Sequence, residues 1–208
     1  MPRRTSAEFQ PRLLRRAIDP VLWTVFLALH TKRQEHGITV IVSDTSMTEA
    51  EALDRVRRVL RCLHGTDPLR FRWVQRYVRH VVVWPGDYTA YDRRGGIHLS
   101  GRYLHAAPEA IVAGGLVHEA VHLRIQRCRI EYRPRLRERI ETICTREQAA
   151  FLRKVPGSGS SWAADAEADL AQPWWTEEDR QARVERAGKQ AGLSAWARKL
   201  LRRFSSDG

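Results

Sequence analysis

The feature that most constrains the fold is a long helical pattern from Pro108 to about Arg127, whose first half is almost wholly apolar. The stretch from Ala110 to Val117 contains no charged side chain. A helix that is apolar on every side is stable in water only when other elements surround it. We therefore expect this helix to lie in the core of a domain, with the rest of the chain packed around it.

The surrounding sequence predicts both strands and helices, and hence an α+β fold. The β-branched runs Ile38–Val42 and His80–Trp84 predict buried strands, and Gly95–Gly96 predicts a turn into a short strand that ends at Ser100. The predicted helices cover residues 17–35, a segment that follows a capping box over Ser46–Glu49, the segment from Pro68 to Tyr77, and a segment from Pro134 to about Val155.

The organisation predicted along the chain is one body and a tail. Residues 1–156 form the body, in which residues 1–80 are an N-terminal part of the same unit, and residues 157–208 form a helical tail. The Gly/Ser-rich stretch Pro156–Ser161 predicts a flexible linker between them. The tryptophans of the tail, Trp174, Trp175 and Trp196, fit either a helix that docks on a partner or membrane surface or one that folds back onto the body.

The buried helix carries the sequence His118-Glu119-Ala120-Val121-His122, which is an H-E-x-x-H motif. Residues four apart project from one face of a helix, so two imidazoles can reach one Zn²⁺ while the glutamate between them accepts a proton from water. The alternative is that both histidines are hydrogen-bonded core residues. The sequence favours zinc ligation by His118 and His122, with Glu119 as the general base.

A catalytic zinc usually has three protein ligands, so one more is needed. Ile125 and Cys128 occupy the places where a metzincin has glycine and histidine, which excludes that pattern. Two glutamates of the next helix remain. With Ile140 as the zero of angle, Glu147 falls at about −20° in a predicted apolar stripe and Glu141 at about +100° on its flank. We therefore predict Glu147 as the third ligand and Glu141 as a salt-bridge or supporting residue. A buried pair of Glu147 with an arginine is the alternative.

This combination of motif and downstream glutamate resembles the gluzincin branch of the zincin metallopeptidases, over roughly residues 80–155. The resemblance implies a zincin-like fold, in which a small twisted sheet packs on the active-site helix and its edge strand binds extended peptide. It implies that zinc is held by His118, His122 and Glu147, and that Glu119 activates water. A zinc protease also needs a group that steadies the oxyanion. Tyr88, Tyr91, His98, His105 and Tyr132 are near in sequence, but spacing does not choose among them, and surface or packing roles fit most of them.

We therefore expect a zinc-dependent hydrolase, and specifically a metallopeptidase acting on a peptide or protein. The alternative is a non-catalytic zinc-binding protein, or a protein that binds a partner or nucleic acid, with the same fold. The net charge of +12 permits a nucleic-acid partner, but 32 of the 36 basic residues are arginine, and the clusters Arg55–Arg61 and Arg133–Arg139 also fit the solvated faces of helices.

Two further features bear on location. Three cysteines are too few for a disulfide framework, which favours a reducing compartment. The apolar run Val21–Leu29 is shorter than the 20 or so residues that span a bilayer, and it lacks a signal-peptide cleavage site. A cytoplasmic protein without a transmembrane segment is therefore expected.

Overall fold

A computed structural model of the chain describes residues 30–43, 47–85, 89–92, 94–157 and 159–171. The predictions for residues 1–29, for Tyr88 and for the tail with Trp174, Trp175 and Trp196 lie outside the described residues. Within the described residues, the helices are all too short or too polar to cross a membrane.

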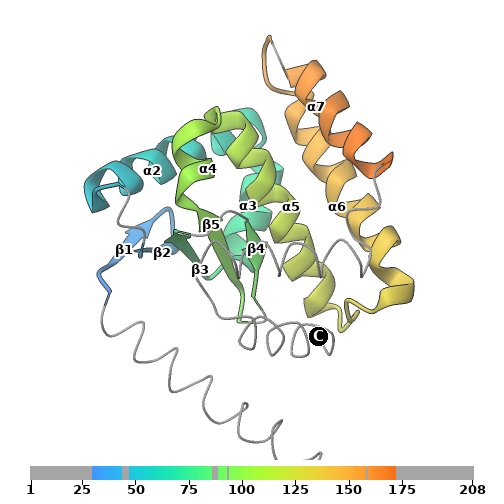
Figure 1. Cartoon of the computed structure of the whole chain (residues 1–208), viewed down its shortest axis with the longest axis horizontal. Helices are drawn as coiled ribbons and strands as arrows, with labels where there is room; N and C mark the ends of the chain where they lie inside the picture. Colours follow the sequence, from blue (N-terminus) through green and yellow to red (C-terminus); the bar gives the residue numbers. More distant parts are fainter. Residues whose placement is uncertain (1–29, 44–46, 86–88, 93, 158, 172–208) are drawn as a thin grey trace, which may run out of the picture.

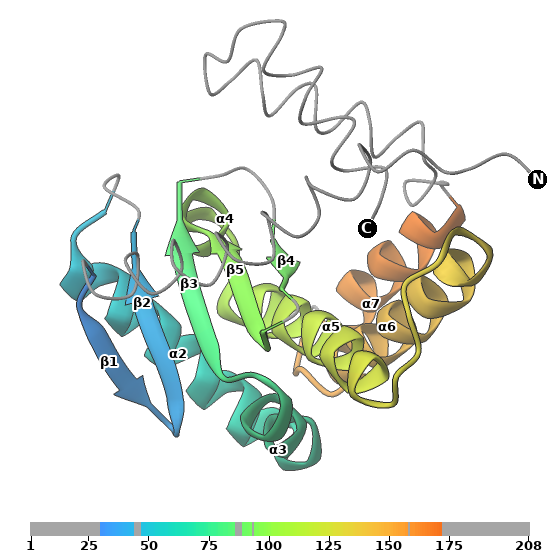
Figure 2. The same cartoon turned by 90° about the horizontal axis from the view of Figure 1, so that it is seen from below.

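Five strands form one mixed sheet in the order β1-β2-β3-β5-β4 (Figures 1 and 2). The three inner strands β2, β3 and β5 run parallel, and the outer strands β1 and β4 are antiparallel to their neighbours. The strand bounds are β1 Lys32–Glu35, β2 Ile38–Val42, β3 His80–Trp84, β4 Ala90–Tyr91 and β5 Gly96–Ser100.

Six α-helices accompany the sheet within the described residues, and Figure 2 shows α2, α3 and α5 lying along one face of it. The helix bounds are α2 Glu49–Thr66, α3 Pro68–Tyr77, α4 Gly101–Ala106, α5 Glu109–Arg127, α6 Arg137–Leu152 and α7 Gly159–Ala168. A short 3₁₀ helix precedes α6, at Pro134–Leu136, and another follows α7, at Asp169–Ala171. The α+β prediction is confirmed at this level.

The apolar helix α5 lies in the core, as its sequence predicts. Its residues Val112, Leu116 and Leu123 belong to the main hydrophobic cluster, together with strand residues such as Val81 and Ile97. Because α5 is enclosed on several sides, any side chain that it carries in the middle of its length faces protein and not bulk water. This is the position of the H-E-x-x-H motif.

Three local predictions are wrong. Residues 32–35 are predicted to continue a helix, but they form β1. Each of these four polar residues pairs with a residue of β2 in an antiparallel ladder. The capping box lies two residues later than predicted, between Thr48 and Glu51. The expected linker leads directly into α7, and Gly159 packs so tightly that a β-carbon there would collide with the carbonyl oxygen of Leu152.

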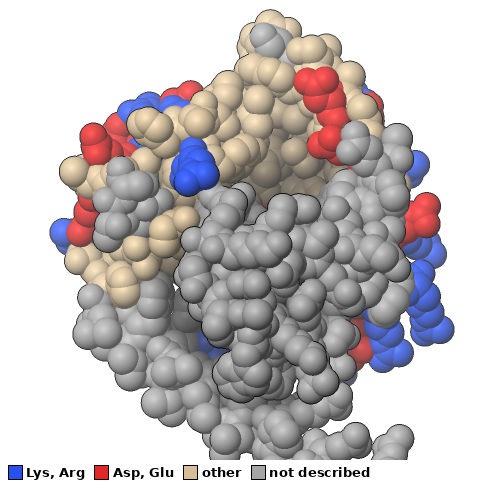
Figure 3. Space-filling model, in the orientation of Figure 1, with Lys and Arg blue, Asp and Glu red and all other residues tan. Residues whose placement is uncertain are grey.

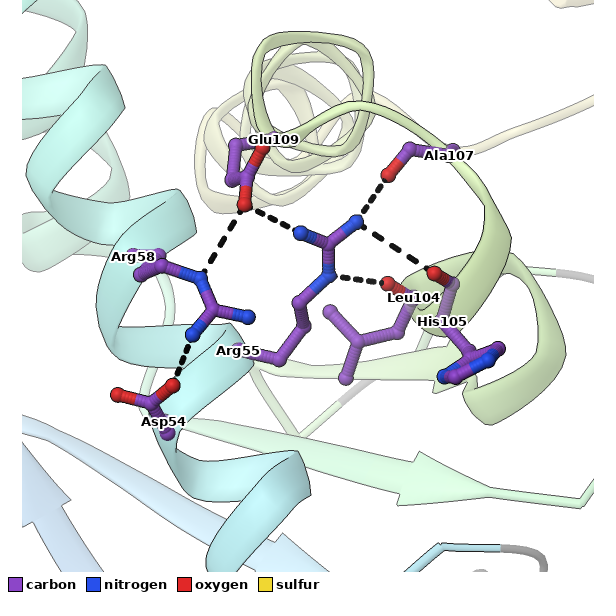
Figure 4. A network of polar contacts seen from close by, with 7 residues as sticks. All are labelled: Asp54, Arg55, Arg58, Leu104, His105, Ala107 and Glu109. Atoms are coloured by element: carbon purple, nitrogen blue, oxygen red, sulfur yellow. Dashed lines mark hydrogen bonds and ion pairs between the residues drawn. The ribbon is translucent and has the colours of Figure 1, made fainter.

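One arginine fixes where α5 begins (Figure 4). The guanidinium of Arg55, on α2, donates to the carbonyl oxygens of Leu104 at 2.8 Å and Ala107 at 2.5 Å, and it pairs with Glu109 in the first turn of α5. Both carbonyls lie at the C-terminal end of α4, where the last carbonyl oxygens of a helix have no N–H donor within the helix. Arg55 therefore joins three helices at the start of the motif-bearing helix.

Candidate metal centre

The helix α5 presents His118 and His122 side by side on its buried face. Their side chains lie one turn apart and retain only 9% and 5% of their exposed area. The Nε2 atoms of the two imidazoles are 3.2 Å apart. The sequence prediction that these two rings converge is therefore confirmed.

The carboxylate that meets the two imidazoles belongs to Glu141 of α6. Its Oε2 atom lies 3.2 Å from Nε2 of His118 and 3.4 Å from Nε2 of His122. Glu141 is only 2% exposed. Burial alone would raise its pKa, but the hydrogen bonds from the two histidines outweigh burial and hold the pKa of Glu141 well below its usual range.

The other predicted ligand, Glu147, lies elsewhere. Its Oε2 atom accepts a hydrogen bond from Arg70 of α3 at 2.5 Å, and the side chain is 31% exposed. This is the arginine pair that the sequence offered as the alternative. The structure thus brings Glu141 and not Glu147 to the histidines, and we correct the predicted ligand set accordingly.

The reason for the error is the side of α6 that is buried. The predicted stripe relied on Ile143, which is 40% exposed. The buried residues Glu141, Thr145 and Leu152 lie at about +100° to +140° from Ile140, so the centre of the buried face is close to Glu141. A polar series of Glu141, Thr145 and Gln148 on this face was the available signal, because polar side chains in a buried face require partners.

The spacing of the three atoms fits a zinc ion. In a tetrahedral site with bonds of about 2.0–2.1 Å, neighbouring ligand atoms lie about 3.3 Å apart. The edges of the triangle formed by His118 Nε2, His122 Nε2 and Glu141 Oε2 measure 3.2, 3.2 and 3.4 Å. The chemistry of the donors, two imidazoles and a carboxylate, is also that of a zinc site.

Gln148 fixes the orientation of one imidazole. Its Oε1 atom lies 3.1 Å from Nδ1 of His118, and a carbonyl oxygen only accepts, so Nδ1 carries a proton. A protonated ring also donates from Nε2 to Glu141, and when Nε2 loses that proton its lone pair faces Glu141 and His122. A cation among these atoms would satisfy them together, and Gln148 would be its second-layer support.

Two tyrosines complete the surroundings of the site. The Tyr132 hydroxyl donates a hydrogen bond to Oε1 of Glu141, and its ring meets His122 edge-on at 5.7 Å. The Tyr91 ring, on β4, stacks on His122 at 4.7 Å. Both tyrosines are among the five residues considered from sequence for the oxyanion role, and the structure places both at His122.

Glu119 lies beside this triangle at a cavity. The cavity has a volume of about 280 Å³ and is lined by Thr89, Tyr103, Gly115, His118, Glu119 and Gln148. Figure 3 shows a hollow on this face of the molecule, between the side formed by α4 and α5 and the side formed by α6 and α7. Burial raises the pKa of Glu119, and a hydrogen bond from the main-chain N–H of Tyr91 holds its carboxylate.

A thiol lies within reach of the same centre. Cys144, one turn after Glu141 on α6, is fully buried, and its Sγ lies within 4.8 Å of a ring nitrogen of each histidine. Burial raises the pKa of this thiol strongly. Cys144 is a further candidate ligand that the sequence did not single out, because one cysteine without a partner cysteine carries no spacing signal.

The remaining predicted residues lie apart from the centre. His105 is exposed at the end of α4, where its main-chain carbonyl accepts a hydrogen bond from Arg55. His98 joins a separate cluster in which Asp92 Oδ2 lies 3.1 Å from Nε2 of His98 and 3.2 Å from Nε2 of His80. The sequence alone did not predict this cluster, because the three side chains meet only through the register of β3, β4 and β5.

Comparisons of the chain with protein-family models, with curated proteins and with solved structures find no match. The arguments for function therefore depend on the geometry of the centre.

Proposed function

We propose that the protein is a zinc-dependent hydrolase whose metal is held by His118, His122 and Glu141. The observation that carries the proposal is the triangle of ligand atoms, whose edges of 3.2, 3.2 and 3.4 Å are those of a tetrahedral zinc site. A site with three protein ligands leaves one position for water, which is the arrangement of catalytic zinc. The general base in this proposal is Glu119.

When bound, zinc lowers the pKa of its water ligand toward about 7 and polarises the carbonyl group that is attacked. Glu119 takes the proton that the attacking water loses and returns it to the leaving group. Burial raises the pKa of Glu119 above its ordinary value, which suits a carboxylate that must both accept and release a proton. The Tyr91 N–H holds this carboxylate in place at the cavity.

A peptide is the substrate that the surroundings favour. The strand β4 is last in the order of described strands, and its residue Tyr91 stacks on His122. An extended peptide can add to a sheet edge by main-chain hydrogen bonds, which would lay its carbonyl groups beside the centre. This arrangement agrees with the resemblance of the H-E-x-x-H motif to that of gluzincins, although the third ligand comes from Glu141.

The test combines metal analysis with hydrolysis of a defined pool of unstructured peptides, followed by mass spectrometry. We expect one zinc per chain and cleavage by the wild type. Glu119→Gln should keep the zinc and lose activity by about 10²–10⁴-fold, because the base is removed while the ligands remain. Glu138→Gln, an exposed change on α6, is the matched control. A wild type without zinc, or a Glu119→Gln variant of full activity, would overturn the proposal.

A second candidate function is a closed structural zinc site, which the position of Cys144 favours. Four ligands (His118, His122, Glu141 and Cys144) would leave no place for water. X-ray absorption at the zinc edge separates the two functions. A Zn–S distance of about 2.3 Å that disappears in Cys144→Ala supports the closed site. A spectrum with only nitrogen and oxygen ligands in the wild type supports the hydrolase.

A further inference from the structure

A surface away from the cavity brings arginines and aromatic rings together. It is formed by α3 and by the last turn of α5. Four exposed arginines and two half-buried aromatic residues make up this α3–α5 surface: Arg72, Arg76, Arg124, Arg127, Trp73 and Tyr77.

The aromatic rings hold arginines from both helices. The guanidinium of Arg124 lies 4.8 Å from the centre of the Trp73 ring. Those of Arg76 and Arg127 each lie 5.8 Å from the centre of the Tyr77 ring. Cation–π attraction at these distances restrains side chains that would otherwise move freely in solvent. The arginine side chains of this surface are therefore partly ordered before any partner binds.

The two segments that form this surface lack acidic residues. Residues 68–79 and 120–130 contain neither aspartate nor glutamate. Among the described residues, none of these four arginines forms an ion pair. The cluster predicted from sequence behaves differently, because Arg55 and Arg58 pair with Glu109 and Arg57 pairs with Glu35.

A groove runs along the exposed side of α3 next to these charges. It has a volume of about 480 Å³ and is lined by Leu69, Arg72, Trp73, Gln75 and Arg76. Leu69 is 48% exposed. The lining thus combines apolar surface, an amide that can donate and accept hydrogen bonds, and two cations. A flat, partly polar ring with a phosphate attached to it complements such a lining.

We propose that the α3–α5 surface binds single-stranded nucleic acid. The unpaired arginines contact successive phosphates, and a base lies in the groove against Leu69 and the exposed part of Trp73. Single strands are recognised by positively charged tracks with aromatic side chains among them, because unpaired bases offer their faces. A continuous duplex keeps its bases stacked inside and would use only the charges. The proposal does not depend on the metal centre.

The test measures binding of fluorescently labelled oligo-dT of 20 nucleotides by anisotropy, over a range of salt concentrations. The matched pair of variants replaces four arginines by glutamine, either on the surface (Arg72, Arg76, Arg124, Arg127) or elsewhere (Arg61, Arg135, Arg139, Arg146), so the net charge changes equally. We expect the surface variant to lose at least 100-fold in affinity and its salt slope to fall by about 3. The control variant should retain most of its affinity.

Two further measurements sharpen the outcome. Trp73→Leu should weaken binding about tenfold, since it removes the ring against which the base lies, with circular dichroism as the check on folding. Equal losses in the two arginine variants would show attraction by net charge alone and would overturn the proposal. Tighter binding to a duplex of the same length would overturn it as well. So would binding confined to anionic vesicles or to polyglutamate.

Discussion

The Tyr132 hydroxyl donates a hydrogen bond to Oε1 of Glu141, while Oε2 of the same carboxylate faces the two histidines. Tyr132 precedes α6 and Glu141 lies within it, so one short segment supplies both the proposed ligand and its support. The bond holds Oε1 and leaves Oε2 directed at the two imidazoles.

Removing this hydroxyl should weaken metal binding without unfolding the protein. We expect Tyr132→Phe to lower zinc affinity by about 10–100-fold, the usual effect of losing a residue that orients a ligand. Titration against a chromophoric chelator measures it. Tyr77→Phe, on α3, is the control and should bind zinc as the wild type does. Unchanged affinity in Tyr132→Phe would show that the hydroxyl does not orient the ligand.

Glu141 and Glu147, both on α6, should respond in opposite ways when replaced by alanine. Glu141→Ala should abolish stoichiometric zinc binding, because it removes a ligand. Glu147→Ala should keep the zinc and lower the free energy of unfolding by about 1–3 kcal/mol, because it removes one of the two charged partners of buried Arg70. Metal analysis and urea unfolding of both variants make the comparison. Zinc loss in Glu147→Ala alone would restore the ligand predicted from sequence.

The cluster of Asp92, His80 and His98 should make the free energy of unfolding depend on pH in the acidic range. Burial would raise the pKa of Asp92, but the hydrogen bonds from both imidazoles and from the N–H groups of Arg94 and Gly96 lower it far below 3.8. A carboxyl whose pKa falls on folding stabilises the protein above its unfolded pKa and loses this effect as pH decreases. Asp92→Asn should therefore cost about 1–3 kcal/mol at pH 7 and progressively less below about pH 4.

Urea unfolding of wild type and Asp92→Asn at several pH values tests this. Asp54→Asn, an exposed change on α2, serves as the control. A difference between wild type and Asp92→Asn that stays constant down to pH 3 would contradict the assignment of the stabilisation to the ionised carboxylate.

Replacing Arg55 should destabilise the protein more than replacing its exposed neighbour Arg57. Arg55→Ala leaves the carbonyl oxygens of Leu104 and Ala107 without their donor, so we expect a loss of about 2–4 kcal/mol in unfolding free energy. Arg55→Lys should recover little, because an ammonium cannot reproduce the fork of the guanidinium. Arg57→Ala, which removes a pair with Glu35 at 45% exposure, should cost at most about 1 kcal/mol.

Strong local patterns in the sequence predict much of this fold. The apolar stretch before His118 predicts the buried helix, and the runs at Ile38 and His80 predict inner strands. β4 has only two residues and carries no period, so it was missed. The segment at Lys32 becomes a strand only through pairing with β2, which is a tertiary effect that no local pattern contains.

Of the candidate metal centre, the sequence predicts the pair of histidines but not the carboxylate that meets them. His118 and His122 are related by one turn of one helix, so their convergence follows from spacing alone. Their meeting with Glu141 depends on how α6 is rotated against α5. A rotation inferred from apolar residues fails where an apolar residue such as Ile143 is exposed. Polar residues in the buried face, Thr145 and Gln148, would have been the better guide.

The contact between His118 and Glu141 joins positions 23 residues apart in the chain. A cation held by both would act as a removable cross-link between α5 and α6, closing a loop that the unfolded chain leaves open. Part of its binding free energy then becomes folding free energy. The folded fraction of such a protein rises and falls with the free metal concentration around it, so the supply of the ion sets how much of the protein persists.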